Sequence, residues 1–159
     1  MSAAIPALVV LGTLLVLVGA LSLARRRLVA VTVRGYSMWP VLAPGDRLLV
    51  LRGGRRITTG RVAVVVAPHP EHGWQGPADS TPDSWYVKRV VAVAGEPVPG
   101  WAALCPGTHV PPGMLVLLGE RQGSWDSKQY GYCPEDKVVG TVLLRLRAAA
   151  TDESSALSS

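Results

Sequence analysis

The sequence predicts a mainly β, largely antiparallel domain that is preceded by one N-terminal transmembrane helix. An uncharged apolar segment at residues 3–24 predicts the helix. After it come six short runs rich in Val and Leu, each bounded by Gly, Pro, Asp or Ser, as is typical of strands and turns. No segment beyond residue 28 shows the 3.6-residue periodicity of an amphipathic helix, so strands are expected to build the fold.

The N-terminal segment is expected to be an uncleaved membrane anchor over residues 1–27, with its helix at about 3–24. About 20 apolar residues cross the hydrocarbon core of a bilayer. A cleaved signal peptide would instead carry a basic N-terminal region and a shorter apolar stretch, whereas no Lys or Arg precedes this run. The lipid bilayer is therefore an expected partner, and the chain is expected to be a single-pass protein of the cell membrane.

The side of the membrane on which the rest of the chain lies is open at this point. Arg25, Arg26 and Arg27 directly follow the apolar segment, and no basic residue precedes it. The positive-inside rule would place the following domain in the cytoplasm. A basic patch beside the membrane can also hold a domain against anionic headgroups on the outer face.

The expected β domain covers residues 28–147. Its six expected strands are 28–33, 47–52, 61–67, 85–95, 113–120 and 138–147. Short strands at this density predict an antiparallel architecture. Residues 68–84 have the Pro- and Gly-containing composition of a loop, and residues 148–159 that of a disordered tail.

Composition argues against several classes of function. The net charge is +5, carried by 13 Arg and 3 Lys, but no helix-turn-helix, zinc finger or aromatic-interleaved basic stripe accompanies it, so a nucleic-acid partner is not expected. Cys105 and Cys133 belong to no CxxC pair and have no His at zinc spacing, so neither a metal nor another cofactor is expected. The two cysteines could form one disulfide or remain two buried thiols.

Residues 33–50 hold the candidate nucleophile. A strand runs into Gly35, then Ser37, then a turn that contains Pro40. A serine on such a turn can expose its hydroxyl while its backbone N–H stays free, as an acyl-transfer nucleophile and its oxyanion hole require. A serine in a turn is more often only a turn residue, so the hypothesis needs a base.

Lys88 is the best candidate for that base. The three histidines, all in Pro- and Gly-rich stretches, are His69, His72 and His109. Arginine stays protonated, whereas burial can lower the pKa of a lysine enough for it to act as a base. Lys88 lies within the apolar run 87–93, while Lys128 and Lys137 have polar surroundings. The residues therefore predict a Ser37–Lys88 pair, a known alternative to a Ser-His-Asp triad.

Both residues belong to a longer series of sequence blocks. The blocks are Ser37-Met38-x-Pro40, Gly45-Asp46-x-x-x-Val50, Lys88-Arg89-Val90-Val91, Gly95-Glu96, Ser124-x-Asp126-Ser127-Lys128 and Tyr130-Gly131. Their content and order resemble the type I signal peptidase family over roughly residues 28–147. The resemblance implies a coiled antiparallel β fold, which signal peptidases share with self-cleaving LexA-type repressors.

The resemblance also implies roles for individual residues. Ser37 would be the nucleophile and Lys88 the general base. Met38 and Pro40 would shape the active-site turn, and Ser124 would orient the lysine. Arg89 and Asp126 would form a charged pair that ties two active-site strands together.

The implied activity is that of a membrane-anchored serine endopeptidase outside the cytoplasm, which cleaves signal peptides or leader sequences from exported precursor polypeptides. Its substrates would bind as an added strand, with small side chains next to the cleaved bond. The chain departs from the family pattern in three places. Gly35 stands where some members have a serine, residues 119–121 read Gly-Glu-Arg in place of Gly-Asp-Asn, and Lys128 replaces an arginine.

Two alternatives remain at this stage. One is a dedicated maturation protease for a single precursor, which the unusual block at residues 119–121 makes reasonable. The other is a catalytically inactive, membrane-anchored β module that binds peptides. The presence of both Ser37 and Lys88 weighs against the inactive module.

Overall fold

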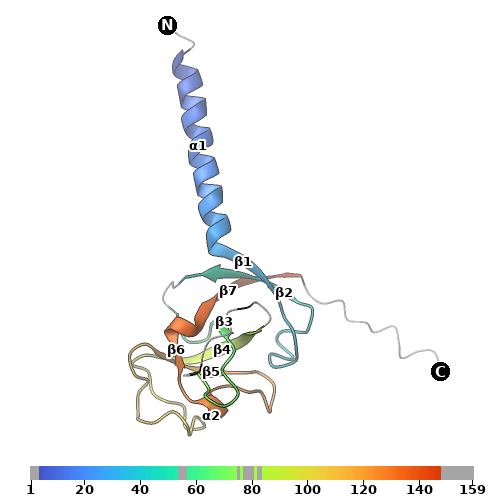
Figure 1. Cartoon of the computed structure of the whole chain (residues 1–159), viewed down its shortest axis with the longest axis vertical. Helices are drawn as coiled ribbons and strands as arrows, with labels where there is room; N and C mark the ends of the chain where they lie inside the picture. The colour runs from blue at the N-terminus through green and yellow to red at the C-terminus, as the bar shows by residue number, and fades with distance from the viewer. Residues whose placement is uncertain (1–3, 54–56, 75, 77–80, 82–83, 148–159) are drawn as a thin grey trace, which may run out of the picture.

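The computed structural model describes residues 4–53, 57–74, 76, 81 and 84–147. The expected disordered tail at 148–159 and part of the expected loop at 68–84 lie outside the described residues. Figure 1 shows one long helix that stands out from one end of a curled β domain.

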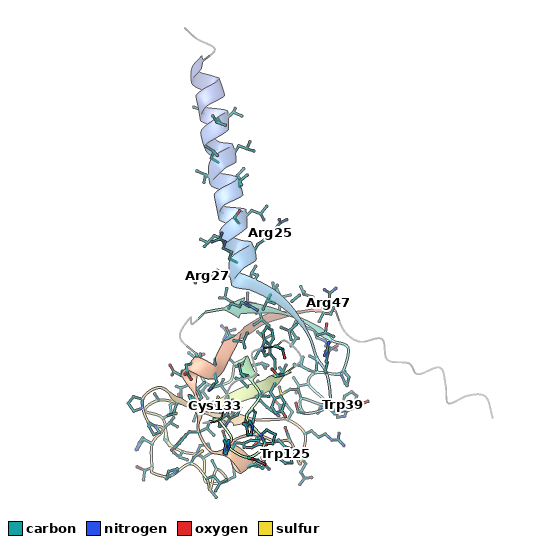
Figure 2. All side chains as sticks on the ribbon, in the orientation of Figure 1. Arg25, Arg27, Trp39, Arg47, Trp125 and Cys133 are labelled. Carbon is teal, nitrogen blue, oxygen red and sulfur yellow. The ribbon has the colours of Figure 1, made fainter. Side chains whose placement is uncertain are left out.

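The helix α1 spans Ala4–Arg27 and leads directly into the first strand. At 1.5 Å per residue a helix of 24 residues is about 36 Å long, enough to cross a bilayer. The side chains described between Val9 and Leu23 are exposed, and the apolar span Val9–Arg27 is not buried against the β domain. The prediction of one apolar N-terminal helix that could span a membrane is therefore confirmed. Figure 2 shows Arg25 and Arg27 at the base of α1, beside the β domain.

Seven strands form one antiparallel sheet in the order β1-β2-β7-β3-β4-β5-β6. The strands are β1 Leu28–Thr32, β2 Arg47–Arg52, β3 Val62–Val66, β4 Trp85–Val93, β5 Met114–Leu118, β6 Cys133–Pro134 and β7 Val138–Arg147. The last strand, β7, lies between β2 and β3, so the C-terminal strand pairs with two strands from the first half of the chain. The predicted mainly β, antiparallel fold is confirmed, and each of the six expected strands is present within one or two residues of its predicted bounds.

The sheet curls around two hydrophobic clusters that meet at β3. Val64 belongs to the cluster under β1 and β2, whereas Ala63 and Val65 belong to the cluster between β4 and β5. Because successive side chains of a strand point to opposite faces, β3 is buried on both sides. This double burial explains why its sequence is a continuous Ala/Val run and not an alternation of apolar and polar residues.

Cys105 and Cys133 are free, buried thiols. Cys133 packs in the cluster between β4 and β5, and Cys105 packs in a third cluster with Ala92 and Val110. The structure thus favours two buried thiols over a disulfide. Each thiol fills part of a different core.

Gly140 lets β7 lie close to β2. A Cβ atom at this position would be 2.3 Å from the Leu51 carbonyl oxygen and 2.8 Å from a methyl group of Val50. The Gly140→Ala change should therefore push the two strands apart and lower the free energy of unfolding by about 2 kcal/mol. Urea unfolding of the full chain in detergent, followed by tryptophan fluorescence, measures the loss.

Gly100→Ala is the matched control, because nothing lies within 4 Å of a Cβ atom at Gly100. Equal unfolding midpoints for the two variants would contradict the close approach of β7 to β2.

Candidate active site

The candidate nucleophile lies on a loop that is closed at its base. The Val33 N–H donates to the Asp46 carbonyl (2.8 Å), and the Gly45 N–H donates to the Val33 carbonyl (2.9 Å). The buried Asp46 carboxylate accepts from the Ala43 N–H (2.8 Å) and from Arg145 Nη2 (2.6 Å). These contacts join the two ends of the loop to each other and to β7, so the loop presents Ser37 from a fixed base.

Within the loop, Ser37 lies between a glycine and a buried anchor. Gly35 has a φ of +78°, a left-handed conformation that glycine adopts without steric cost. Met38 is 1% exposed and packs in the core, and its carbonyl accepts from the Leu42 N–H (2.8 Å). Pro40 follows a cis peptide bond on the exposed side of the turn. Met38 and Pro40 thus lie in the turn itself, and their role in shaping an active site stays a prediction.

The candidate base, Lys88, is the largest fully buried side chain among the described residues, at 2% exposure. It lies on β4 opposite Ala63 of β3. Lys88 Nζ donates a 2.6 Å hydrogen bond to Ser124 Oγ and lies 5.3 Å from the centre of the Tyr86 ring. The ammonium group therefore has few polar partners in place of water.

Burial lowers the pKa of Lys88 from 10.5 to about 8. The Asp126 carboxylate acts in the opposite direction and raises this pKa, while the Lys128 ammonium lowers it further. Desolvation is the largest of these effects because the charged form loses its hydration. At pH 7 roughly one lysine in ten would then be neutral and able to accept a proton.

Ser124 is held next to Ser37 by the segment that follows β5. The Arg121 N–H donates to the Ser37 carbonyl (3.0 Å), and the Ser124 N–H donates to the Arg121 carbonyl (3.1 Å). A Cβ atom at Gly119 would lie 1.9 Å from Ser124 Oγ and 2.9 Å from the Ser37 carbonyl. Gly119 is therefore required for this packing, although the sequence indicated it only as part of an unusual block.

Asp126 fixes the other side of Ser124. Its carboxylate, which is fully buried, accepts from the Gly119 N–H (2.9 Å) and the Lys128 N–H (3.0 Å) and pairs with Lys128 Nζ (3.1 Å). The Gln129 side chain accepts in return from the Asp126 N–H (3.0 Å), which completes a capping box. This box begins the short helix α2, Ser127–Tyr130. Asp126 thus links the end of β5 to α2.

The expected pair between Arg89 and Asp126 is not formed among the described residues. Arg89 pairs with Glu120 and donates to the Gly60 carbonyl (2.8 Å), whereas Asp126 pairs with Lys128. Alternation along β4 explains the difference, since Arg89 points to the face opposite Lys88, whose partner Ser124 belongs to the same segment as Asp126. Glu120, which the sequence indicated only as part of the departure at residues 119–121, forms the ion pair between β4 and the segment after β5.

Ser37, Lys88 and Ser124 all line one cleft of about 450 Å³. Its walls come from residues 31–32, 34–37, 85–88 and 121–125. In the described part of the chain no hydrogen bond joins Ser37 to Lys88, whose Nζ is bonded to Ser124. Catalytic hydrogen bonds are often long before a substrate binds, so a shared cleft is the relevant geometry.

No histidine lines this cleft. His69 and His72 stack on each other with ring centres 4.9 Å apart, and His109 contacts the Thr108 hydroxyl (3.1 Å). Among the described residues, no three His, Cys, Asp or Glu side chains are grouped as metal ligands would be. The cleft therefore offers a serine and a buried lysine for chemistry.

Two similarities to known proteins bear on this site. Residues 5–100 match the family model described as signal peptidase, peptidase S26. The chain is also 26% identical over 135 residues to a protein of Synechocystis sp. named "Probable signal peptidase I-1", with 72% of this chain and 68% of the relative covered. The family match includes Ser37 and Lys88 and ends before Ser124 and Asp126, so the case for these last two residues rests on geometry and on the resemblance of their sequence block.

The lowered pKa of Lys88 predicts how stability changes with pH. Below about pH 8 the lysine is charged in both the folded and the unfolded chain, and its burial costs about 3 kcal/mol. Between pH 8 and 10.5 the folded state releases this proton first, so the cost should disappear as the pH rises. Relative to Lys88→Met, the wild type should therefore gain about 3 kcal/mol between pH 7 and pH 10.5.

Urea unfolding of both full chains in detergent at the two pH values measures this gain. Other titrating groups are common to the two proteins and cancel in the difference. A stability difference that does not change with pH would contradict the buried ammonium.

Proposed function

The chain belongs to the signal peptidase family, peptidase S26, and we propose that it is a membrane-anchored serine endopeptidase with Ser37 as nucleophile and Lys88 as general base. The observation that carries the proposal is the environment of Lys88. Its side chain is buried, its pKa is lowered to about 8, and it is held by Ser124 in the cleft that Ser37 also lines. These are the conditions that turn a lysine into a base near neutral pH.

The proposed reaction begins when neutral Lys88 accepts the proton of Ser37 and Ser37 Oγ attacks a peptide carbonyl. Lys88 then gives this proton to the leaving amine, and an acyl-enzyme remains on Ser37. A water molecule, deprotonated by Lys88, hydrolyses the acyl-enzyme and restores the serine. In this scheme Ser124 orients the lysine, and Asp126 and Gly119 keep Ser124 in place.

The developing oxyanion needs a donor, and we assign the Ser37 backbone N–H to this role. Gly35 offers no side-chain hydroxyl, and within the described residues the Ser37 N–H makes no hydrogen bond of its own. A free N–H beside the attacking oxygen can stabilise the negative charge as it forms. The left-handed Gly35 supports this by turning the chain just before the nucleophile.

The proposed substrate is the signal peptide or leader of an exported precursor. An extended segment could lie along the cleft between β1 and β4, whose residues Val31, Thr32 and 85–88 line it. Helix α1 would anchor the domain in the cell membrane, with the catalytic domain outside the cytoplasm and Arg25–Arg27 against anionic headgroups. Protease accessibility of the domain in intact and permeabilised cells tests this orientation, and protection in intact cells would contradict it.

Ser37→Ala and Lys88→Ala should each reduce cleavage of a precursor by at least about a thousandfold, because one removes the nucleophile and the other the base. His69→Ala is the control, since His69 lies outside the cleft, and it should keep nearly full activity. Cleavage is measured with the purified full chain in detergent and a precursor whose leader ends in small residues. Near-normal activity of Lys88→Ala together with loss in His69→Ala would exclude the Ser-Lys pair.

The pH dependence of cleavage should report the charge on Lys88. Because the neutral form is the base, kcat/KM should rise with pH through about 8 and then level off. Lys128→Gln removes a cation that lowers the pKa of Lys88 and leaves Asp126 without its ion pair. Both changes raise the pKa of Lys88, so the rise in activity should move to higher pH.

Lys137→Gln removes a lysine that contributes no shift to Lys88, and its pH profile should match that of the wild type. A Lys128→Gln profile that stays in place or moves to lower pH would show that Lys88 is not the group being titrated.

A further inference from the structure

The described residues that line the catalytic cleft carry only positive charges. Arg34 and Arg121 line it together with Lys88, and the described lining residues include no Asp or Glu. Lys88 is buried, whereas Arg34 and Arg121 are exposed. A partly enclosed cleft with charges of one sign attracts ligands of the opposite sign.

Arg121 is the better placed of the two arginines. Its backbone N–H is bonded to the carbonyl of Ser37 (3.0 Å), which fixes its main chain beside the nucleophile. Its guanidinium lies over the ring of Tyr36, 5.7 Å from the ring centre. This cation–π contact places the positive charge over the ring of the residue that precedes Ser37, in the cleft that Ser37 also lines, although both side chains are exposed.

Among the described residues, the carboxylates nearest in sequence to Arg121 pair with other cations. Glu120 pairs with Arg89 on β4, and the buried Asp126 pairs with Lys128. Within the described residues Arg121 itself has no ion pair, and its guanidinium makes a cation–π contact with Tyr36. The guanidinium therefore keeps its hydrogen-bond donors available to a ligand in the cleft.

We propose that the enzyme selects precursors with an acidic residue close to the cleaved bond, whose carboxylate pairs with Arg121. This inference rests on the proposed peptidase function and names a feature of its substrates. The planar guanidinium can donate two parallel hydrogen bonds to a carboxylate, and the flat face of Tyr36 leaves this fork exposed.

The position of the acidic residue is constrained by Lys88. A carboxylate close to Lys88 would stabilise the ammonium form and slow the reaction. Lys88 comes from β4, whereas Arg121 comes from the segment after β5. The acidic side chain should therefore point toward Arg121 and away from Lys88 and its hydrogen-bond partner Ser124. Since this ion pair forms on binding and does not change during attack, it should lower KM more than it raises kcat.

The test uses peptide pairs that differ only by Glu or Gln at each of the two positions on either side of the cleaved bond. With the full chain in detergent at low salt, the wild type should cleave one Glu peptide about threefold to tenfold better in kcat/KM than its Gln partner. At about 1 M salt this ratio should approach one, because the Debye length falls to about 3 Å.

Variants of Arg121 test whether this side chain causes the preference for Glu peptides. Arg121→Gln should abolish the Glu preference, Arg121→Glu should reverse it in favour of a Lys peptide, and Arg121→Lys should retain part of it. Arg47→Gln is the matched control, since it removes the same charge from an exposed residue that does not line the cleft (Figure 2). It should keep the full preference.

The possible failures are distinguishable. Equal cleavage of every Glu and Gln pair by the wild type, or a Glu preference that survives in Arg121→Gln, would overturn this inference and leave the peptidase function intact. If the wild type cleaves no peptide and an acylating serine-directed inhibitor fails to label Ser37, the proposed function itself fails and the inference with it.

Discussion

The hydrogen bond between Lys88 and Ser124 is the interaction on which the rest of the site depends. A lysine at 2% exposure has lost the water that stabilises its charge, and Ser124 Oγ, at 2.6 Å, is the hydrogen-bond partner that the structure gives its Nζ. The cost of this burial, about 3 kcal/mol at neutral pH, is a large share of the stability of a small domain. In the proposed mechanism the same burial makes the lysine a base, so the protein loses stability at the residue that would give it reactivity.

The surrounding elements hold the Lys88–Ser124 hydrogen bond in place. Strand β4 lies between β3 and β5, which surrounds Lys88 with the apolar side chains that desolvate it. Gly119 allows Ser124 to lie against the backbone of Ser37, and Asp126 fixes the chain on the other side through its capping box. Asp126 also limits the effect of burial, since its charge raises the pKa that desolvation lowers. The final value near 8 therefore reflects burial and the Lys128 charge, which lower the pKa, against the Asp126 charge, which raises it.

The sequence was sufficient to predict the fold, and it also led to the proposal of the Ser37–Lys88 pair, because both leave local signals. Apolar runs between turn residues predict strands, and a lysine inside such a run predicts a buried lysine. Strand β6, with two residues, and helix α2, with four, are too short to produce a periodic pattern. The partner of Arg89 could not be inferred either. This partner depends on which face of β4 each side chain occupies. In the structure Arg89 pairs with Glu120, and Asp126 pairs with Lys128. The charge that Arg121 places beside Ser37 also becomes visible only in three dimensions.

The most direct test of this account is an NMR titration of the lysine side chains. The chain has three lysines, so protein labelled with ¹³C at lysine Cε gives three signals, and Lys88→Met identifies the one that belongs to Lys88. The account predicts that this signal titrates near pH 8 in the full chain in detergent. Titration of the Lys88 signal near the ordinary value of 10.5 would contradict the account, because the lysine would then remain charged at the pH where it is proposed to act as the base.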